Sequence, residues 1–144
     1  MGQTQILAGE VMEDFRQQAL EQTLSRMCSD LDNYLEDKYG RTYPVHPNRP
    51  IRGKAANPAH DGLFSTGTMF TLGFGSKYGR GYILDMEIRT LTPVDPATRK
   101  MIEEDGVSFL SGRLKDYFPD RNLRIERDGR VWKIVGDFSL GTAS

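Results

Sequence analysis

The sequence contains little cysteine, no large excess of charge of either sign and no long hydrophobic run. A single cysteine, Cys28, excludes an intramolecular disulfide, and cysteine-rich zinc motifs are absent. The 19 basic and 20 acidic residues give a net charge of −1, which is unlike a wholly basic nucleic-acid binder or an acidic disordered tail. The longest uncharged stretch, residues 62–76, is rich in Gly, Ser and Thr, so we expect no membrane span. The first residues lack the basic and apolar regions of a signal peptide, and we therefore expect a cytoplasmic protein.

The 144 residues suit one domain, and their charges are segregated along the chain. Residues 1–40 carry three basic and eight acidic side chains, a net charge of −5. Residues 41–81 carry six basic side chains and one acidic side chain, a net charge of +5. The middle of the chain is therefore a local cationic segment, although the whole chain is almost neutral.

Two segments have the spacing of amphipathic helices. Over residues 5–39, apolar side chains such as Leu24 and Leu31 recur at three- and four-residue steps, and Gly40 suits a left-handed helix end. An unbroken helix of that length would span about 50 Å, so we expect it either to break or to pack its outer part on another chain. Asp95 and Pro96 suit the N-cap and first position of a second helix, over residues 96–117.

Four segments read as strands in two hairpins. Residues 63–74 and 82–91 alternate between apolar and polar side chains, with a glycine-rich loop at 75–81 between them. In this hairpin Asp85 and Glu87 are expected opposite Met69, Thr71 and Gly73. The dipeptide Asp128-Gly129 is a strong signal for a tight hairpin. Closing the turn at that dipeptide pairs Ile125 with Trp132 and Leu123 with Ile134, all on one apolar face.

The resulting element order, α-β-β-α-β-β, predicts an α+β fold. We expect a four-stranded antiparallel sheet with two helices on one face, a plait-like two-layer sandwich. Residues 1–144 would form a single domain with three parts: the long helix 5–39, a proline-rich basic connection at 41–61, and a β-β-α-β-β unit at 62–140. The fold class alone does not indicate a function.

Two cationic segments are candidate sites for an anionic ligand. The loop 75–81 offers Lys77, Tyr78 and Arg80 among glycines whose backbone N–H groups could converge on an anion. It joins two strands, so the phosphate fingerprints that use a helix N-terminus do not apply. The connection 41–61 offers Arg49, Arg52 and Lys54, held extended by prolines. The alternative is that both segments are simply solvated loops.

Four other side chains could support acid–base chemistry. Asp85 and Glu87 point the same way from one strand, and His46 and His60 lie in the connection. Asp85 and Glu87 equally suit the polar outer face of an antiparallel sheet. Two histidines thirteen residues apart are weak support for zinc, so we expect neither a metal nor a cofactor. Cys28 lies on the apolar helix stripe and reads as a packed side chain rather than a nucleophile.

Two functional hypotheses follow from these residues. The preferred one is a non-enzymatic binding domain, a homodimer, whose segment 41–81 contacts a phosphate-bearing small molecule or a nucleic acid. The alternative is a small hydrolase- or isomerase-like enzyme that uses His46 or His60 with Asp85 or Glu87 in an interface cleft. No motif combines a nucleophile, a base and an orienting group, which favours the binding domain.

Overall fold

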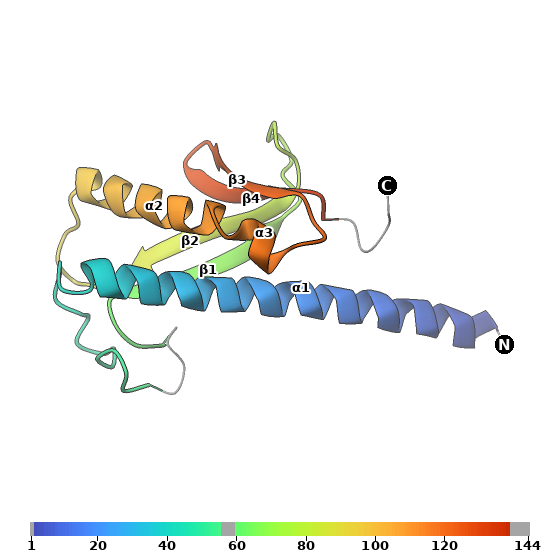
Figure 1. Cartoon of the computed structure of the whole chain (residues 1–144), viewed down its shortest axis with the longest axis horizontal. Coiled ribbons are helices and arrows are strands. Elements are labelled where there is room, and N and C mark those ends of the chain that lie inside the picture. Colours follow the sequence, from blue (N-terminus) through green and yellow to red (C-terminus); the bar gives the residue numbers. More distant parts are fainter. Residues whose placement is uncertain (1, 56–59, 139–144) are drawn as a thin grey trace.

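The chain folds as one four-stranded antiparallel sheet with its helices packed on one face (Figure 1). A computed structural model describes residues 2–55 and 60–138, with side chains described from residue 15 onward. The helices are α1 (Gly2–Tyr39), α2 (Pro96–Ser111) and the short α3 (Leu114–Tyr117). The strands are β1 (Phe64–Thr71), β2 (Gly81–Ile88), β3 (Leu123–Asp128) and β4 (Val131–Gly136). Their spatial order is β1-β2-β4-β3, so the predicted α+β class and element order are confirmed.

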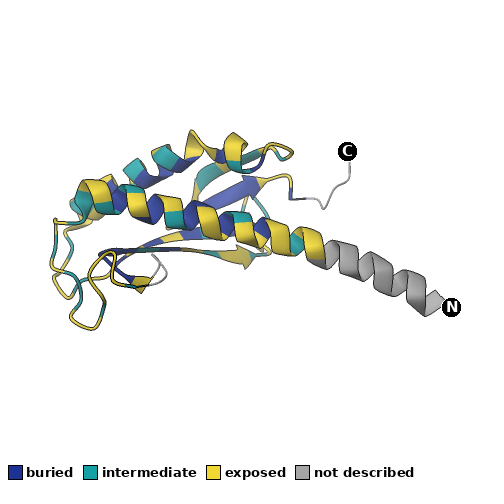
Figure 2. Ribbon diagram, turned by 60° about the horizontal axis from the view of Figure 1, so that its bottom comes forward, coloured by how far each residue is buried: buried dark blue, intermediate teal, exposed yellow. Residues whose placement is uncertain are grey.

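Helix α1 is continuous from Gly2 to Tyr39 and runs well past the end of the sheet (Figure 1). Figure 2 shows buried positions recurring along its inner half. Its inner half carries the predicted apolar stripe, which is buried: Leu20, Leu24, Met27, Leu31 and Leu35. The left-handed end predicted at Gly40 is wrong, because no positive φ occurs there. Glycine is needed for a different reason: a Cβ at residue 40 would lie 2.5 Å from the backbone oxygen of Glu36.

The second predicted helix is divided into α2 and α3. Its start is as predicted, with the Asp95 carboxylate accepting a hydrogen bond from Thr98 N at 3.2 Å and Pro96 in the first turn. The helix stops at Ser111, where the N–H of Gly112 bonds back to Ser108 O and Arg113 leaves the helical conformation. The single turn of α3 follows. The predicted span of 96–117 therefore contains one break.

Both hairpins differ from their predicted registers. In the second, Ile125 pairs with Ile134 and Arg127 with Trp132, because the two-residue loop is Gly129-Arg130. Gly129 has φ 64°, which suits a glycine at the first central position of a hairpin loop. Asp128 stays in β3, where its carboxylate bonds to the Lys133 amine. The shift is an even number of residues, so the predicted apolar face is preserved.

The first hairpin has a longer loop than the glycine pattern suggested. Asp85 pairs with Gly67 and Glu87 with Ser65, so the predicted neighbours Met69, Thr71 and Gly73 are wrong. The reason is that β1 ends at Thr71 and β2 begins at Gly81, which leaves residues 72–80 in the loop.

This loop folds over the sheet face that points away from the helices. Lys133 and Val135 alternate with Ile134 along β4 and so face away from the helices, yet both are buried. The Lys133 amine donates to Gly79 O, to Ser76 Oγ at 3.3 Å and to the Asp128 carboxylate at 3.1 Å. We call these four residues the lysine clasp. It covers part of the sheet face opposite the helices.

Candidate functional site

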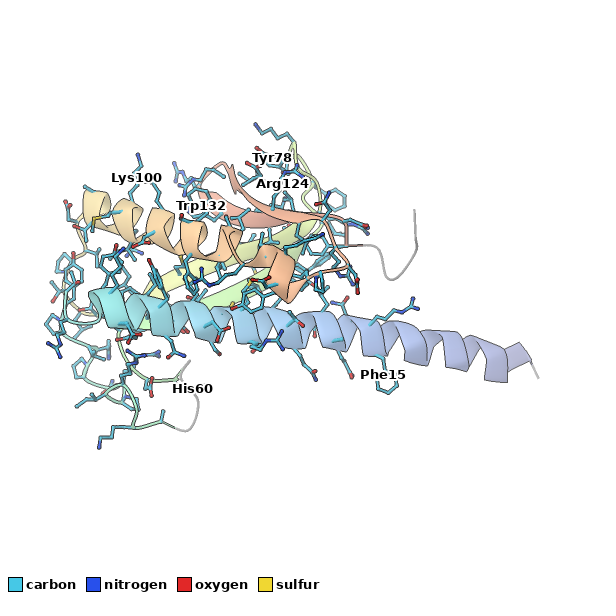
Figure 3. The ribbon with its side chains drawn as sticks, in the orientation of Figure 1. Phe15, His60, Tyr78, Lys100, Arg124 and Trp132 are labelled. Atoms are coloured by element: carbon cyan, nitrogen blue, oxygen red, sulfur yellow. The ribbon has the colours of Figure 1, made fainter. Side chains whose placement is uncertain are left out.

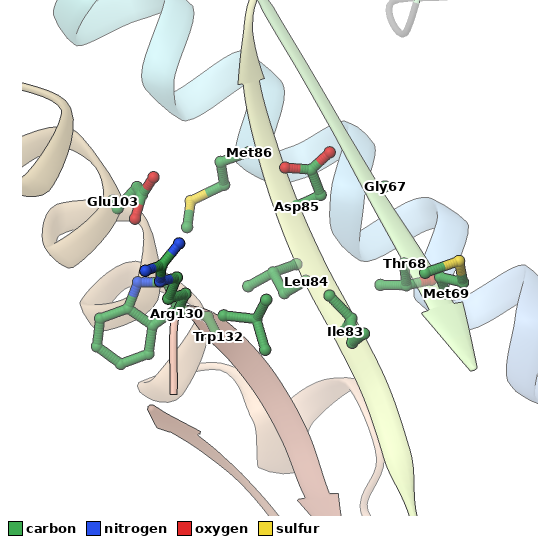
Figure 4. Close-up of a pocket in the computed structure, with 11 residues that line it drawn as sticks. Gly67, Thr68, Met69, Ile83, Leu84, Asp85, Met86, Glu103, Arg130 and Trp132 are labelled. Carbon is green, nitrogen blue, oxygen red and sulfur yellow. The ribbon is translucent and has the colours of Figure 1, made fainter. Parts of the chain in front are cut away.

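A groove opens between α2 and the β3–β4 hairpin. It exists because β4 pairs with β2 only over Tyr82–Leu84, so residues 85–88 of β2 have no β4 partner. Two cavities of about 440 and 610 Å³ adjoin there and share Glu103, Arg130 and Trp132 in their walls. Figure 4 shows the smaller cavity, with Trp132 and Arg130 on one side and Asp85 and Met69 on the other.

The larger cavity has more positive than negative charge. Its wall contains four basic residues and two acidic ones: Arg99, Lys100, Arg127, Arg130, Glu103 and Glu104. The Arg127 guanidinium lies 3.6 Å from the Glu103 carboxylate, and the Lys100 amine lies 4.0 Å from the Glu104 carboxylate. Both carboxylates are thus paired, while Arg99 and Arg130 add charge that the wall does not balance.

Trp132 gives the groove a polar donor as well as an apolar surface. It is half-buried on β4, and the Arg127 guanidinium lies 5.3 Å from the centroid of its ring. Its indole N–H is buried and has no hydrogen-bond partner within the described part of the chain. A buried donor without an acceptor is costly. An acceptor on a ligand in the groove would remove that cost, and an anionic acceptor would also neutralise the excess cations.

The loop residues of the sequence prediction lie together in a different place. The Lys77 amine is 5.0 Å from the centroid of the Tyr78 ring, and the Arg124 guanidinium of β3 is 6.0 Å from the same centroid. Figure 3 shows Tyr78 and Arg124 at the same end of the sheet, apart from Lys100 and Trp132. Arg80 is exposed. Lys77 and Arg124 form a surface cluster around the Tyr78 ring, and neither they nor Arg80 line the groove.

Two of the three predicted cations of the connection have structural partners. The Arg49 guanidinium donates to the carbonyl oxygens of Asp61, Gly62 and Phe64 at 2.8, 2.6 and 3.1 Å. Arg52 pairs with Asp37 of α1 at 2.5 Å, and Lys54 is exposed. The connection is irregular, as predicted, but Arg49 and Arg52 anchor it to the domain.

Both predicted histidines line one cleft, of about 500 Å³, together with Ser65 and Arg89. The His46 Nδ1 accepts a hydrogen bond from Asn48 N at 3.1 Å, which leaves its other ring nitrogen available. Figure 3 shows His60 in the connection, away from Trp132.

The two predicted carboxylates are separated by this arrangement. Glu87 forms an ion pair with Arg89 at 3.1 Å, beside the histidine cleft, whereas Asp85 lines the groove. Across the side chains described for residues 15–55 and 60–138, no three His, Cys, Asp or Glu residues come together as a metal site.

The groove residues were missed by sequence reasoning. Arg99 and Lys100 come from α2, while Arg127, Arg130 and Trp132 come from the second hairpin. Only the packing of the helix beside the hairpin brings them together. One local feature of the sequence could have indicated the groove: the single tryptophan of the chain follows two arginines and the hairpin dipeptide.

Comparison with known proteins shows a family. A family model described as "Uncharacterised protein" matches residues 15–136, which contain the groove and the histidine cleft. The chain belongs to that family. A similar protein from Borreliella burgdorferi, named "Uncharacterized protein", is 48% identical over 118 residues, covering 82% of this chain and 92% of the relative. No solved structure matches the chain. In the part of the chain that the structure describes, none of the helices has the length and apolar character needed to cross a membrane.

Proposed function

We propose that the protein is a small, non-enzymatic binding domain that takes an anionic ligand in the groove between α2 and the β3–β4 hairpin. The observation that carries this proposal is the buried, unpaired indole N–H of Trp132 in a wall with unbalanced cations. Arg99 and Arg130 supply the charge, and the indole supplies a directed hydrogen bond to one ligand oxygen.

The groove supports this proposal better than the predicted cationic segment does. Charge alone is common on solvated loops, and Arg49 and Arg52 already bond to the domain. The groove combines charge with enclosure and an unmet donor, which are features of small-molecule sites. Its dimensions favour a phosphate-bearing small molecule over a long nucleic acid strand, which would need an extended cationic track with several aromatic platforms.

Trp132 provides a direct test because it is the only tryptophan in the chain. Its fluorescence would be followed during titration with inorganic phosphate, with ATP and with a short single-stranded oligonucleotide, each at two salt concentrations. We expect a saturable change with a phosphate-bearing small molecule. We also expect affinity to fall at high salt, because charge contacts are screened.

Two double variants separate the groove from the loop. Arg99→Gln with Arg130→Gln should weaken binding by about tenfold or more, since charge-assisted hydrogen bonds are lost. Lys77→Gln with Arg80→Gln removes the same charge from the loop and should change affinity less than about twofold. The reverse pattern would move the site to the loop. No saturable signal with any probe would refute the proposal.

The acid–base alternative has one supporting observation, the meeting of His46 and His60 in a single cleft. Ser65 and Arg89 share that cleft, but Asp85 lies in the groove and Glu87 is paired with Arg89. A general base needs a partner that orients it. Among the described residues the His46 ring is bonded by Asn48 N, and neither predicted carboxylate bonds to it. We therefore favour binding over catalysis.

A further inference from the structure

Asp32 is a buried carboxylate with one oxygen unmet. It lies on the inner half of α1 and only 2% of its surface is exposed. Its Oδ1 accepts a hydrogen bond from Thr66 Oγ1 of β1 at 2.7 Å. Its Oδ2 is buried and has no partner among the described residues. A buried carboxylate normally has its oxygens fully bonded, because each unmet oxygen costs solvation energy.

This carboxylate lines a cavity of about 270 Å³ between α1 and β1. A water molecule occupies about 30 Å³, so the cavity has room for a small organic group. Its wall offers the hydroxyl groups of Ser25, Ser29 and Thr68 and the carboxylate of Glu21, which is exposed. The described lining contains two acidic residues and no basic one, so the cavity has the opposite charge to the groove.

We propose that this cavity binds the ammonium group of a small primary amine, with Asp32 Oδ2 as its principal acceptor. An ammonium group carries three N–H donors and no acceptor, which matches a wall of carboxylate and hydroxyl oxygens. Divalent cations fit less well, because they require several oxygen ligands around one point and no metal cluster occurs among the described side chains. Cys28, Thr66 and Thr68 also line the cavity and provide contact for a short carbon chain.

The test uses ethylamine hydrochloride as the probe, with potassium chloride and tetramethylammonium chloride at matched ionic strength. The melting temperature of the full chain would be measured at about pH 8, where a folded-state ligand must raise it. We expect a saturable rise with ethylamine alone. We expect the rise to disappear in Asp32→Asn and to persist in Asp120→Asn, which removes an exposed carboxylate elsewhere.

Several outcomes would overturn the proposal. An equal rise with potassium would indicate an alkali-ion site, and an equal rise with tetramethylammonium would indicate a general cation effect. No rise would mean that the cavity holds only water. An unchanged rise in Asp32→Asn would place any binding elsewhere.

A second measurement does not depend on the folding of the variant. Carbon-detected NMR of the wild-type chain would follow the titration of the Asp32 carboxyl with and without ethylamine. We expect bound ammonium to lower the pKa of Asp32, because a nearby positive charge favours the ionised form. An unchanged pKa at saturating ethylamine would refute the proposal. The proposed function of the groove is tested separately, since its probes are anions and its signal comes from Trp132.

Discussion

At the scale of single residues, Asp32 is a buried acid of the core whose pKa is strongly shifted. Burial raises its pKa to about 7, more than the Thr66 hydrogen bonds and the Arg49 charge lower it, and the Glu36 charge raises it further. Burial also raises the pKa of the nearby Cys28 thiol to about 12, with the Asp32 charge contributing. Cys28 is therefore a protonated, packed side chain at neutral pH, as its place on the helix stripe predicted.

This perturbation predicts how an uncharged replacement changes stability with pH. The folded pKa of about 7 lies above the unfolded value of 3.8. Below about pH 4 the protonated Asp32 carboxyl therefore makes its full contribution to the free energy of unfolding. That contribution is lost as the pH rises to about 7. Asparagine does not titrate, so Asp32→Asn should gain roughly 2–4 kcal/mol in free energy of unfolding relative to wild type over that range. Urea unfolding at about pH 4.5 and about pH 8 measures the difference.

Asp105 is the matched control, with the opposite sign. Burial raises its pKa, but hydrogen bonds from Lys38, Tyr39 and Tyr34 lower it more, and the net shift is downward. Its contribution to stability is present at pH values above the ordinary pKa of a carboxyl group and is lost as the pH falls below that value. Asp105→Asn should therefore cost stability at about pH 8 and less in acid. A pH-independent difference for Asp32→Asn would contradict the assignment.

At the scale of elements, α2 approaches the core through a glycine. A Cβ at Gly106 would lie 2.7 Å from Met86 Sδ and 3.3 Å from Leu31 Cδ1. Gly106→Ala should therefore lower the free energy of unfolding by about 1–3 kcal/mol, the usual cost of overpacking a core. Gly112→Ala, where a Cβ would meet only ordinary contacts near 3.8 Å, should be neutral or stabilising because alanine favours helix. Equal effects of the two changes in thermal or urea unfolding would refute this packing argument.

The elements themselves were largely predictable, but their registers were not. The sequence pattern shows which face each side chain occupies, both in the alternation along β1 and β2 and in the stripe of α1. Burial of the apolar side chains determines that face. Register depends on where a loop closes. Asp128 lies in β3, where Lys133 of the same hairpin and Ser76, 52 residues away in the sequence, bond to its carboxylate. The same limit applies to the groove, whose cations come from two elements with no shared motif.

At the scale of the whole molecule, the outer part of α1 extends beyond the sheet (Figure 1). A helix without tertiary packing is marginally stable in water. Phe15, the first residue of α1 whose side chain is described, is 62% exposed. The predicted homodimer would cover it. Light scattering should then give about twice the chain mass of 16.3 kDa, and Phe15→Glu should shift the protein toward monomer.

A matched variant tests whether α1 is the surface involved. Phe74, at 90% exposure, lies in the loop 72–80, and Phe74→Glu should leave the mass unchanged. A monomer mass for the wild-type chain at micromolar concentration would contradict the dimer. A mass lowered by Phe74→Glu but not by Phe15→Glu would place the contact on the loop side of the sheet.

The lysine clasp allows the opening of the loop 72–80 to be measured by chemical modification of Lys133. Five of the six lysines are exposed, whereas Lys133 is 2% exposed beneath Gly79 and Ser76. Detachment of residues 72–80 from the sheet would expose Lys133 to an amine-acylating reagent, because Ser76 and Gly79 of that loop bond to its buried amine. The acylation half-life of that one lysine, read by mass spectrometry against the five fast-reacting ones, therefore measures how often the loop opens in the native protein.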